Sequence, residues 1–378
     1  MTTLGPMPFR RSRGMHDLLP QDMSGFRRIE DAFRDATRRW GYEEVRTPTL
    51  ETYSLFTVAG GLKPDALSRV YTFLDWDGWS GERLVVRPDS TIPVARAAAE
   101  ADLPLPARLF YVQNRFLFSG AEEAEDWQCG LELLDAPATT GEVEIASVAC
   151  ETLEALGLQP AVRLSHVTVA TALGNGSAQG GDNEAARQPL REAAARPATG
   201  SGLCANLLAI AAARAPELVS PLQDLATVAR ALDEAGRSVV VDLQMPVDFE
   251  YYSGVVLELE HDGHPVGSGG RYTPGWSGLT QTACGCALPV AEVEALLAPR
   301  EPAPSPISVF SEGPDQLAAA LQVASELHGA GFSALLGPPQ PGSLAVLVRS
   351  GGLAAVLPEG ERDVAGVPEL IALLRDPE

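Results

Sequence analysis

Several features are scarce or missing in this 378-residue sequence, and each narrows the range of possible functions. No run of lysine or arginine stands out against 50 acidic and 28 basic residues, which give a formal net charge of −22. Affinity for nucleic acids comes largely from cations that neutralise phosphates, so we expect no nucleic-acid partner. Simple solubility through net charge explains the acidity equally well, so the charge identifies no other partner.

Long apolar runs are also missing. The opening residues MTTLGPMPFRRSRGMHDLLP contain no apolar signal-peptide core, and no segment approaches the ~20 apolar residues of a membrane span. We therefore expect a cytoplasmic protein without membrane contact. The five cysteines are odd in number and scattered, which fits a reducing compartment better than a disulfide framework.

The usual signatures of catalysis are absent as well. The sequence contains no Ser/His/Asp order, no HExxH motif and no P-loop, and its five histidines do not cluster. Cys284 and Cys286 would share one face of a strand, but no histidine or third cysteine lies nearby to complete a metal site. We therefore predict no metal, no cofactor and no acid–base chemistry centred on histidine.

The pattern of apolar residues predicts an α+β fold. A helix over about 22–40, capped by Asp22 or Ser24, would place Phe26, Ile29, Phe33 and Trp40 in one stripe facing a core. Further helices are expected at 92–100 and 143–156, with several more in an alanine-rich insertion over about 184–236. Strands are expected at 42–48, 70–74, 82–87, 108–113, 131–134, 239–243, 252–260 and 284–288. Many strands without regular β-α alternation indicate a largely antiparallel sheet flanked by helices.

A proline-rich segment divides the chain. We expect a large domain over 1–297 and a stiff linker, APREPAPSP, over 298–306. Residues 307–378 then predict a small α/β domain. Its strands are expected at 307–310, 333–336, 344–348 and 354–357, and its helices at 314–329 and 367–374.

Two short segments place carboxylates where they could meet a ligand. In Arg87-Pro88-Asp89-Ser90-Thr91 the carboxylate of Asp89 and the hydroxyl of Thr91 could accept from an ammonium group, or Asp89 or Ser90 could simply cap the next helix. Gln128 and Glu132 share a face on a helix or on a strand. A ligand imidazole or ammonium is one partner for that carboxylate, and a surface salt bridge is the alternative.

Two aromatic segments lie near the next strands. Residues 248–254, DFEYYSG, place two phenols and two carboxylates ahead of an apolar strand, and residues 267–272, GSGGRY, follow a hairpin. The glycines could let backbone amides approach a ligand, although a hairpin loop needs glycine in any case.

In their order and spacing, these pieces resemble histidyl-tRNA synthetase, a class II synthetase, over roughly residues 10–297. The matching segments are RGMHDLLP (13–20), GYEEVRTP (41–48), YTF (71–73), RPDST (87–91), 110–132, EYY (250–252), GGRY (269–272) and 283–293. The resemblance implies that Asp89, Thr91 and Gln128 hold the ammonium of a bound histidine, and that Glu132 and Tyr252 contact its imidazole. It also assigns Glu250, Tyr251, Arg271 and Tyr272 to the two histidine-specific motifs, and so to the residues that bind histidine.

The same resemblance implies that catalysis is lost. The arginine that binds the α-phosphate of ATP falls on Leu117, the histidine-specific arginine on Val247, and the arginine of the third class II motif on Glu292. Loss of one transition-state charge clamp typically costs about 3–4 kcal/mol, so three losses predict that no catalytic residues remain.

A synthetase-like chain without synthetase chemistry resembles the regulatory subunit of short-form ATP phosphoribosyltransferase, the first enzyme of histidine biosynthesis. That resemblance implies a homodimer formed through the class II core, a hetero-oligomer with the short catalytic subunit whose activity requires it, and feedback inhibition by histidine. Histidine would bind in the retained pocket or at a subunit interface. The alternatives are another synthetase paralogue that binds an amino acid, and a divergent histidyl-tRNA synthetase.

Overall fold

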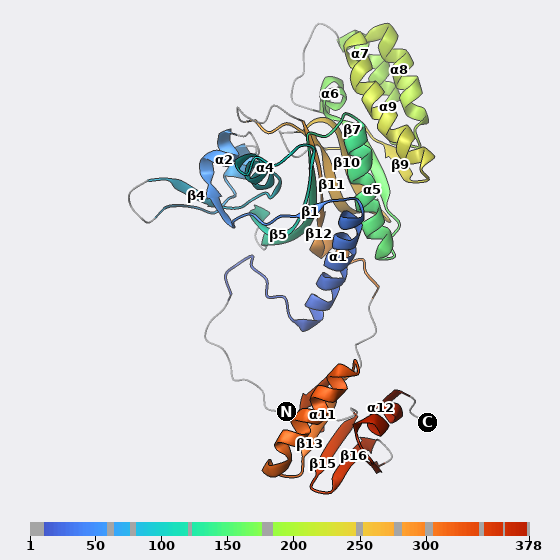
Figure 1. Ribbon diagram of the computed structural model, residues 1–378. Coiled ribbons are helices and arrows are strands. Elements are labelled where there is room, and N and C mark those ends of the chain that lie inside the picture. Colours follow the sequence, from blue (N-terminus) through green and yellow to red (C-terminus); the bar gives the residue numbers. More distant parts are fainter. Residues whose placement is uncertain are drawn as a thin grey trace. The chain divides into compact units, whose positions relative to one another are not determined.

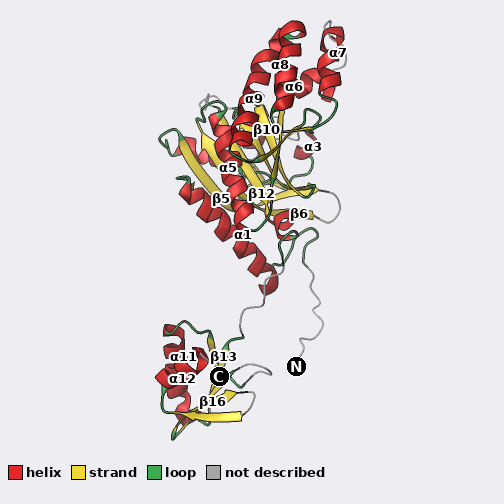
Figure 2. Cartoon of the chain, turned by 90° about the vertical axis from the view of Figure 1, so that its right-hand side faces the viewer, coloured by secondary structure: helices red, strands yellow, loops and turns green. Residues whose placement is uncertain are grey.

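The computed structural model describes residues 11–58, 64–75, 81–119, 123–175, 184–246, 252–275, 282–298, 305–339, 344–357 and 360–375. The chain divides into two compact units, Met1–Leu297 and Ala298–Glu378 (Figures 1 and 2). Each unit has a hydrophobic core of its own.

A nine-stranded sheet forms the centre of the first unit. Its strands run in the order β1-β5-β6-β12-β11-β10-β7-β9-β8, and β1 lies at the edge. Only the pairs β1/β5 and β7/β9 are parallel among these strands, so the expectation of a largely antiparallel sheet is confirmed. The strands are β1 Glu43–Glu44, β5 Ala107–Ser119, β6 Glu123–Leu134, β7 Ala161–His166, β8 Ala198–Thr199, β9 Ser238–Val241, β10 Tyr252–His261, β11 His264–Tyr272 and β12 Ala283–Pro289.

Helices α1 (Pro20–Arg39), α5 (Thr140–Ala155) and α9 (Val219–Glu234) pack against one face of this sheet (Figure 1). The predicted stripe on α1 is correct for Phe26, Ile29 and Phe33, which are buried. It is wrong for Trp40, which lies beyond the helix end, is 36% exposed and donates its indole N–H to Glu151 at 3.0 Å. The predicted cap is also displaced, because Asp22 lies inside the helix and accepts from the backbone N–H of Leu19 at 2.8 Å.

The alanine-rich insertion forms α7 (Glu184–Ala193), α8 (Gly202–Arg214) and α9, which lie together near β7 and β9 (Figure 1). Two short helical segments follow β7 before this group: α6 (Val167–Ala170) and a π-helical turn at Thr171–Asn175. A 3-10 turn at Pro216–Leu218 connects α8 to α9. The leucines of α8 and α9 face the same core as α1 and α5, so the insertion extends that core.

The other face of the sheet is covered by a small antiparallel sheet, β2-β4-β3, and by three helices (Figure 1). These elements are β2 Leu50–Thr52, β3 Thr72–Leu74, β4 Arg83–Val86, α2 Tyr53–Val58, α3 Pro64–Leu67 and α4 Thr91–Glu100. They form a second apolar cluster, in which Phe56, Val85 and Ile92 pack with Tyr111 of β5 and Tyr272 of β11. The two faces of the large sheet therefore belong to different cores.

The glycine-rich segment 267–270 differs from its sequence-based interpretation as a possible hairpin loop. It lies inside β11, and the hairpin turns at Asp262 and Gly263 instead. Glycine is needed there because the strands approach closely: a Cβ on Gly269 would lie 2.3 Å from the carbonyl oxygen of Gly285. Sequence patterns also missed β7, which pairs with β10 and β9.

The second unit is a small α/β domain with a five-stranded sheet in the order β14-β13-β15-β16-β17. Its elements are β13 Ile307–Ser311, a 3-10 turn at Pro314–Gln316, α11 Leu317–Gly329, β14 Ala334–Leu336, β15 Ala345–Arg349, β16 Gly352–Leu357, β17 Gly360–Val364 and α12 Val367–Arg375. The strand β17 was not predicted from the sequence. Within the described ranges, no helix of either unit has the length and apolar character that a bilayer span requires.

A buried ion pair joins β11 to α5. Arg271 donates from Nε to Glu142 Oε1 and from Nη2 to Glu142 Oε2, both at 2.7 Å, and it also donates to the carbonyl oxygens of Ala136 and Pro137. The side chains of Arg271 and Glu142 are 10% and 2% exposed. The pair therefore fixes the helix against the sheet.

We predict that Glu142→Ala strongly destabilises the first unit. Removing one partner of a buried ion pair leaves an uncompensated charge and costs about 3–5 kcal/mol. Urea unfolding followed by tryptophan fluorescence tests this, because all five tryptophans precede residue 298. The control is Glu217→Ala, which breaks the exposed Arg187–Glu217 pair and should barely shift the midpoint. Equal shifts for the two variants would contradict the prediction.

Candidate functional site

Strand register gathers the first group of predicted site residues on one face of the large sheet. On β6, Gln128 and Glu132 point to the same side, as their even spacing predicted. Tyr111 of β5 lies directly opposite Gly130, and Gly285 of β12 lies directly opposite Glu132. This is the face covered by α2, α4 and the small sheet.

Two glycines make room for this group. A Cβ on Gly130 would lie 2.2 Å from Cζ of Tyr111, and a Cβ on Gly285 would lie 2.0 Å from Oε2 of Glu132. Real Cβ atoms do not approach other heavy atoms that closely. The Tyr111 phenol therefore lies over the backbone of Gly130, and the Glu132 carboxylate lies over the backbone of Gly285, where a side chain would clash.

Glu132 is the centre of the cluster and is only 1% exposed. The Tyr272 hydroxyl donates to its Oε2 at 2.8 Å, and the hydroxyls of Thr91 and Tyr111 lie near enough to lower its pKa as well. Burial raises the pKa of Glu132 to about 8, and the three hydroxyls oppose that shift without cancelling it. Near neutral pH the ligand-free carboxyl therefore holds its proton for much of the time.

Asp89 is the second carboxylate of the cluster and is 5% exposed. Its Oδ1 accepts from the backbone N–H of Ile92 at 3.1 Å, so the helix-capping interpretation of this segment is confirmed. Burial raises the pKa of Asp89, although the backbone N–H groups and the charge of Arg115 lower it. The cap and a ligand are compatible, since a carboxylate has further lone pairs.

A comparison of all buried carboxylates distinguishes these two from the rest. Among the residues that the structure describes, seven aspartates and glutamates are buried. Five of them form ion pairs with arginine: Glu30, Glu51, Glu142, Glu144 and Asp242. Asp89 and Glu132 form none within the same ranges. Because a buried carboxylate requires a compensating partner, this cluster is the part of the described structure best suited to a ligand cation.

The other predicted site residues are distributed differently. Tyr252 lies directly opposite Tyr272 across β10 and β11, next to the cluster. Glu250 and Tyr251 fall outside the described residues, as does Val247. Arg271 points to the opposite face of the sheet, where Glu142 and two carbonyl oxygens use its guanidinium. The expectation that Arg271 contacts histidine is therefore corrected.

Arg115 is a candidate residue that sequence patterns missed. It lies on β5 on the same side as Tyr111, and its Nε donates to Asp126 at 3.0 Å. Its terminal nitrogens, Nη1 and Nη2, have no hydrogen-bond partner among the described residues. Its charge lowers the pKa of Asp89 and of Tyr111, so it lies close to both. The even spacing from Tyr111 was the available signal.

A cavity of about 330 Å³ adjoins Arg115. Leu117 lies in its wall, with carboxylates from two elements: Glu125 and Asp126 of β6, and Glu292 and Glu294 of α10 (Val290–Glu294). Burial and the nearby charge of Asp22 raise the pKa of Glu294. Apart from Arg115, the charged groups of this wall therefore disfavour phosphates.

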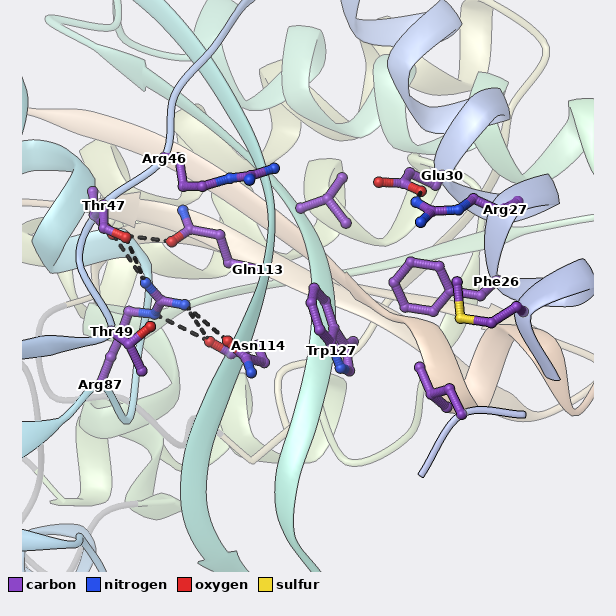
Figure 3. Close-up of a pocket in the computed structure, with 13 residues that line it drawn as sticks. Phe26, Arg27, Glu30, Arg46, Thr47, Thr49, Arg87, Gln113, Asn114 and Trp127 are labelled. Carbon is purple, nitrogen blue, oxygen red and sulfur yellow. Dashed lines mark hydrogen bonds and ion pairs between the residues drawn. The ribbon is translucent and has the colours of Figure 1, made fainter. Parts of the chain in front are cut away.

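A second cavity, of about 400 Å³, lies between α1 and the segment 46–49 (Figure 3). Figure 3 shows Arg46, Thr47, Arg87 and Gln113 on one side of it. The aromatic rings of Phe26 and Trp127 form part of the other side and also line the first cavity.

No group of histidine, cysteine and carboxylate side chains within the described ranges is arranged to hold a metal ion. Cys284 and Cys286 do share one face of β12, as alternation predicted, but both are buried in the helix-side core. Burial raises the pKa of both thiols well above the ordinary range, so these cysteines are packing residues.

Comparison with known proteins agrees with this architecture. The family model for histidyl-tRNA synthetase matches residues 14–200 and 181–293. A solved structure described as an ATP phosphoribosyltransferase regulatory subunit/histidyl-tRNA synthetase from Bacillus halodurans superposes with a TM-score of 0.75 at 23% identity, covering 91% of this chain and 99% of that one. Histidyl-tRNA synthetase from Nostoc sp. PCC 7120 gives 0.74 at 15% identity, covering 97% and 99%. The fold is that of a class II histidyl-tRNA synthetase-like protein.

Curated sequences narrow the assignment within that class. The ATP phosphoribosyltransferase regulatory subunit of Dehalococcoides mccartyi is 39% identical over 311 residues, which are 74% of this chain and 75% of the relative. The protein of the same name from Symbiobacterium thermophilum is 33% identical over 85% of this chain and 88% of the relative. The chain belongs to the family of ATP phosphoribosyltransferase regulatory subunits, which confirms the resemblance inferred from its motifs.

The raised pKa of Glu132 predicts a pH-dependent stability. Between the ordinary value of 4.5 and about 8, the folded chain holds a proton that the unfolded chain has released. The contribution of Glu132 to the free energy of unfolding is therefore most favourable below pH 4.5, declines as the pH rises towards 8, and is constant above that. Glu132→Gln removes this dependence.

Urea unfolding at pH 5 and pH 8 measures the effect. From pH 5 to pH 8, wild type should lose on the order of 3–5 kcal/mol relative to Glu132→Gln. The difference between the two proteins isolates Glu132 from other titrating groups. Glu234→Gln, at an exposed position on α9, is the control and should follow wild type. If wild type and Glu132→Gln change in parallel, the assignment of a raised pKa to Glu132 is wrong.

Proposed function

We propose that the chain is a non-catalytic subunit that binds histidine in the cluster around Glu132 and transmits this binding to the short catalytic subunit of ATP phosphoribosyltransferase. Two buried carboxylates without an arginine partner are the observation on which the proposal chiefly rests. We further propose that the catalytic subunit requires this chain for activity, and that histidine binding inhibits the complex. The family of the chain supports that partnership.

The chemistry of the cluster suits the cationic groups of histidine. The Asp89 carboxylate and Thr91 hydroxyl would accept from the ammonium, with the amide of Gln128 on the same side of the sheet. Glu132 and Tyr252 would contact the imidazole ring. A cation replaces the proton that burial otherwise holds on Glu132, so binding and proton release are coupled.

The carboxylate of the ligand also needs a cation. Arg87 does not supply it, because its guanidinium donates to the carbonyl oxygens of Thr47, Pro48 and Asn114. Arg115 has unpaired terminal nitrogens among the described residues and lies close to Asp89. We propose that Arg115 anchors the ligand carboxylate, a planar fork-to-carboxylate contact that arginine forms well.

The neighbouring cavity supports a non-catalytic role. Leu117 and Glu292 both line it. We propose that Leu117 stands in place of the arginine that binds the α-phosphate in the resembling synthetases, and Glu292 in place of the arginine of the third class II motif. Carboxylates in this wall would repel the phosphates of ATP. Glu250, Tyr251 and Tyr272 stay in the proposed site as residues of the histidine-specific motifs, with Tyr272 acting through Glu132.

Feedback follows if histidine binds two states of the complex with different affinity. A ligand shifts a conformational equilibrium only by its differential affinity for the states, so the buried cluster must differ between them. The parallel pairing of β1 with β5 places the proposed homodimer segment, 41–48, beside the strand that bears Tyr111. We propose a cytoplasmic homodimer that assembles with catalytic subunits.

We predict that calorimetry detects histidine binding by the purified chain and that Glu132→Gln weakens it tenfold or more. A hydrogen bond to a charged group contributes about 1.5–3 kcal/mol, and about 1.4 kcal/mol corresponds to tenfold. Histamine, which lacks the carboxylate, separates the role of Arg115. Arg115→Ala should weaken histidine binding about tenfold and leave histamine binding unchanged. If wild type does not bind histidine, the proposed histidine site is wrong. If Arg115→Ala weakens histidine and histamine binding equally, Arg115 does not anchor the ligand carboxylate.

We also predict that the chain supports no histidine-dependent ATP–pyrophosphate exchange, whereas a histidyl-tRNA synthetase does so under the same conditions. In a complex with the short catalytic subunit, the chain should raise phosphoribosyl transfer, and added histidine should suppress it. Glu132→Gln should keep the activation and lose the suppression. Suppression that persists in Glu132→Gln would place the inhibitory histidine elsewhere, such as at a subunit interface.

A further inference from the structure

We propose that one edge of the small α/β unit, formed by strand β14 and the adjoining flank of α11, is a docking surface for an extended segment of the catalytic subunit. That segment would add a strand to the sheet, with apolar side chains towards α11 and a basic residue at one end. This inference rests on the proposed partnership with the catalytic subunit and adds a surface on which that subunit docks.

The two edge strands of the five-stranded sheet differ in how they are protected against pairing. On β17, three consecutive exposed residues, Glu361, Arg362 and Asp363, are charged, which is a common protection of an edge strand. On β14 the side chains are those of one alanine and two leucines. The sequence has no charged residue from 329 to 348, although 21% of the whole chain is charged. The β14 edge is therefore suited to another strand, and the β17 edge is not.

Strand β14 has unpaired backbone groups at this edge. Its sheet neighbour among the described strands is β13 alone. Hydrogen bonds at the two ends of β14 are formed with β13 by Ser333, whose carbonyl accepts at 2.8 Å, and by Gly337, whose N–H donates at 3.0 Å. Because a parallel ladder uses alternate residues of a strand, Ala334 and Leu336 direct their N–H and C=O groups away from β13. An added strand could pair with them.

The adjoining flank of α11 is apolar and exposed. Leu317, Leu321 and His328 are separated by four and seven residues, so they share one side of the helix. His328 lies against β14, because its Nε2 donates to the carbonyl oxygen of Ala334 at 2.9 Å. Leu317 and Leu321 therefore face this edge, and they are 55% and 56% exposed. Leu336 points to the same side, since its register partner in β13 belongs to the core beneath α11, yet it is 45% exposed.

Charge indicates which partner fits this surface. Asp315 is exposed two residues before Leu317, and neither α11 nor β14 contains a lysine or an arginine. A basic residue at the end of the added strand would therefore meet a complementary charge. A second copy of this chain would bring like charge, because acidic residues outnumber basic ones over 298–378. These observations favour a different polypeptide, and the catalytic subunit is the partner proposed for this chain.

The contact would be one part of a larger interface. A three-residue strand and three leucines do not by themselves supply the roughly 1,200 Å² that a stable complex usually buries. In strand addition, main-chain hydrogen bonds provide affinity and alternate side chains provide selectivity. We therefore expect substitutions here to weaken assembly without abolishing it.

Hydrogen exchange on the full-length chain, alone and saturated with the catalytic subunit, tests the docking surface. The amides of Ala334 and Leu336 should exchange rapidly in the free chain and be protected in the complex. Unchanged exchange on complex formation overturns the proposal. Slow exchange of both amides in the free chain also overturns it, and does so in favour of a second copy if the protection increases with chain concentration.

Leu336→Lys should weaken association with the catalytic subunit about tenfold, because it places a charge on the edge strand and removes an apolar contact. Gln322→Lys is the matched control, since it adds the same charge at an exposed position on a different side of α11, and it should associate as wild type does. Asp315→Asn should weaken association about twofold to fivefold, as expected for an exposed ion pair. Protected amides of β15 should show that all three variants remain folded.

The outcomes separate this inference from the proposed function. Equal association by Leu336→Lys and wild type overturns the docking surface and leaves the partnership intact. Equal loss in Leu336→Lys and Gln322→Lys shows a general effect of charge and also overturns docking at β14. If wild type does not associate with the catalytic subunit at all, the partnership and the docking surface are both wrong.

Discussion

The structure around the proposed site depends on one electrostatic constraint: two neighbouring carboxyl groups, Asp89 and Glu132, are buried without an ion pair to arginine among the described residues. Elsewhere in the described structure, every buried aspartate or glutamate is paired with arginine. Glu132 can remain buried because hydroxyl groups surround it and because Gly285 leaves it the necessary space. Stability alone would not favour this arrangement, since unpaired buried charge is destabilising. A site that binds and releases a cation would explain why these carboxyl groups are buried without an ion pair.

Strand alternation made much of this site predictable. Once residues 128–132 are recognised as a strand, the even spacing of Gln128, Gly130 and Glu132 fixes their common face. The helix stripe of Phe26, Ile29 and Phe33 and the largely antiparallel sheet followed from patterns of the same kind. The pattern could not show which face of each strand points towards the site and which points towards the helices α1, α5 and α9. Arg271 was assigned to the site by its motif, yet alternation turns its side chain towards Glu142 in α5.

Contacts between segments far apart in sequence account for the remaining errors. The glycines of β11 were interpreted as a possible loop because local composition does not reveal how closely β12 approaches them; a Cβ on Gly269 would lie 2.3 Å from a carbonyl oxygen of that strand. Trp40 looked like a core residue because its spacing continues the stripe, but α1 ends at Arg39. Arg115 escaped notice because its even spacing from Tyr111 shows only a shared strand face and does not show that the face carries a site. Arg115 becomes a candidate only because the fold brings Asp89, from a distant segment, near enough for the charge of Arg115 to lower its pKa.

The two cavities next to β5 and β6 have opposite charge, and the pair Phe26 and Trp127 contributes to both walls. On one side, carboxylates of β6 and α10 disfavour phosphates. On the other side, three arginines, Arg27, Arg46 and Arg87, line the cavity with a single carboxylate, that of Glu30. A charged group in either cavity would respond chiefly to the charges of the nearer wall, because Coulomb energy falls with distance.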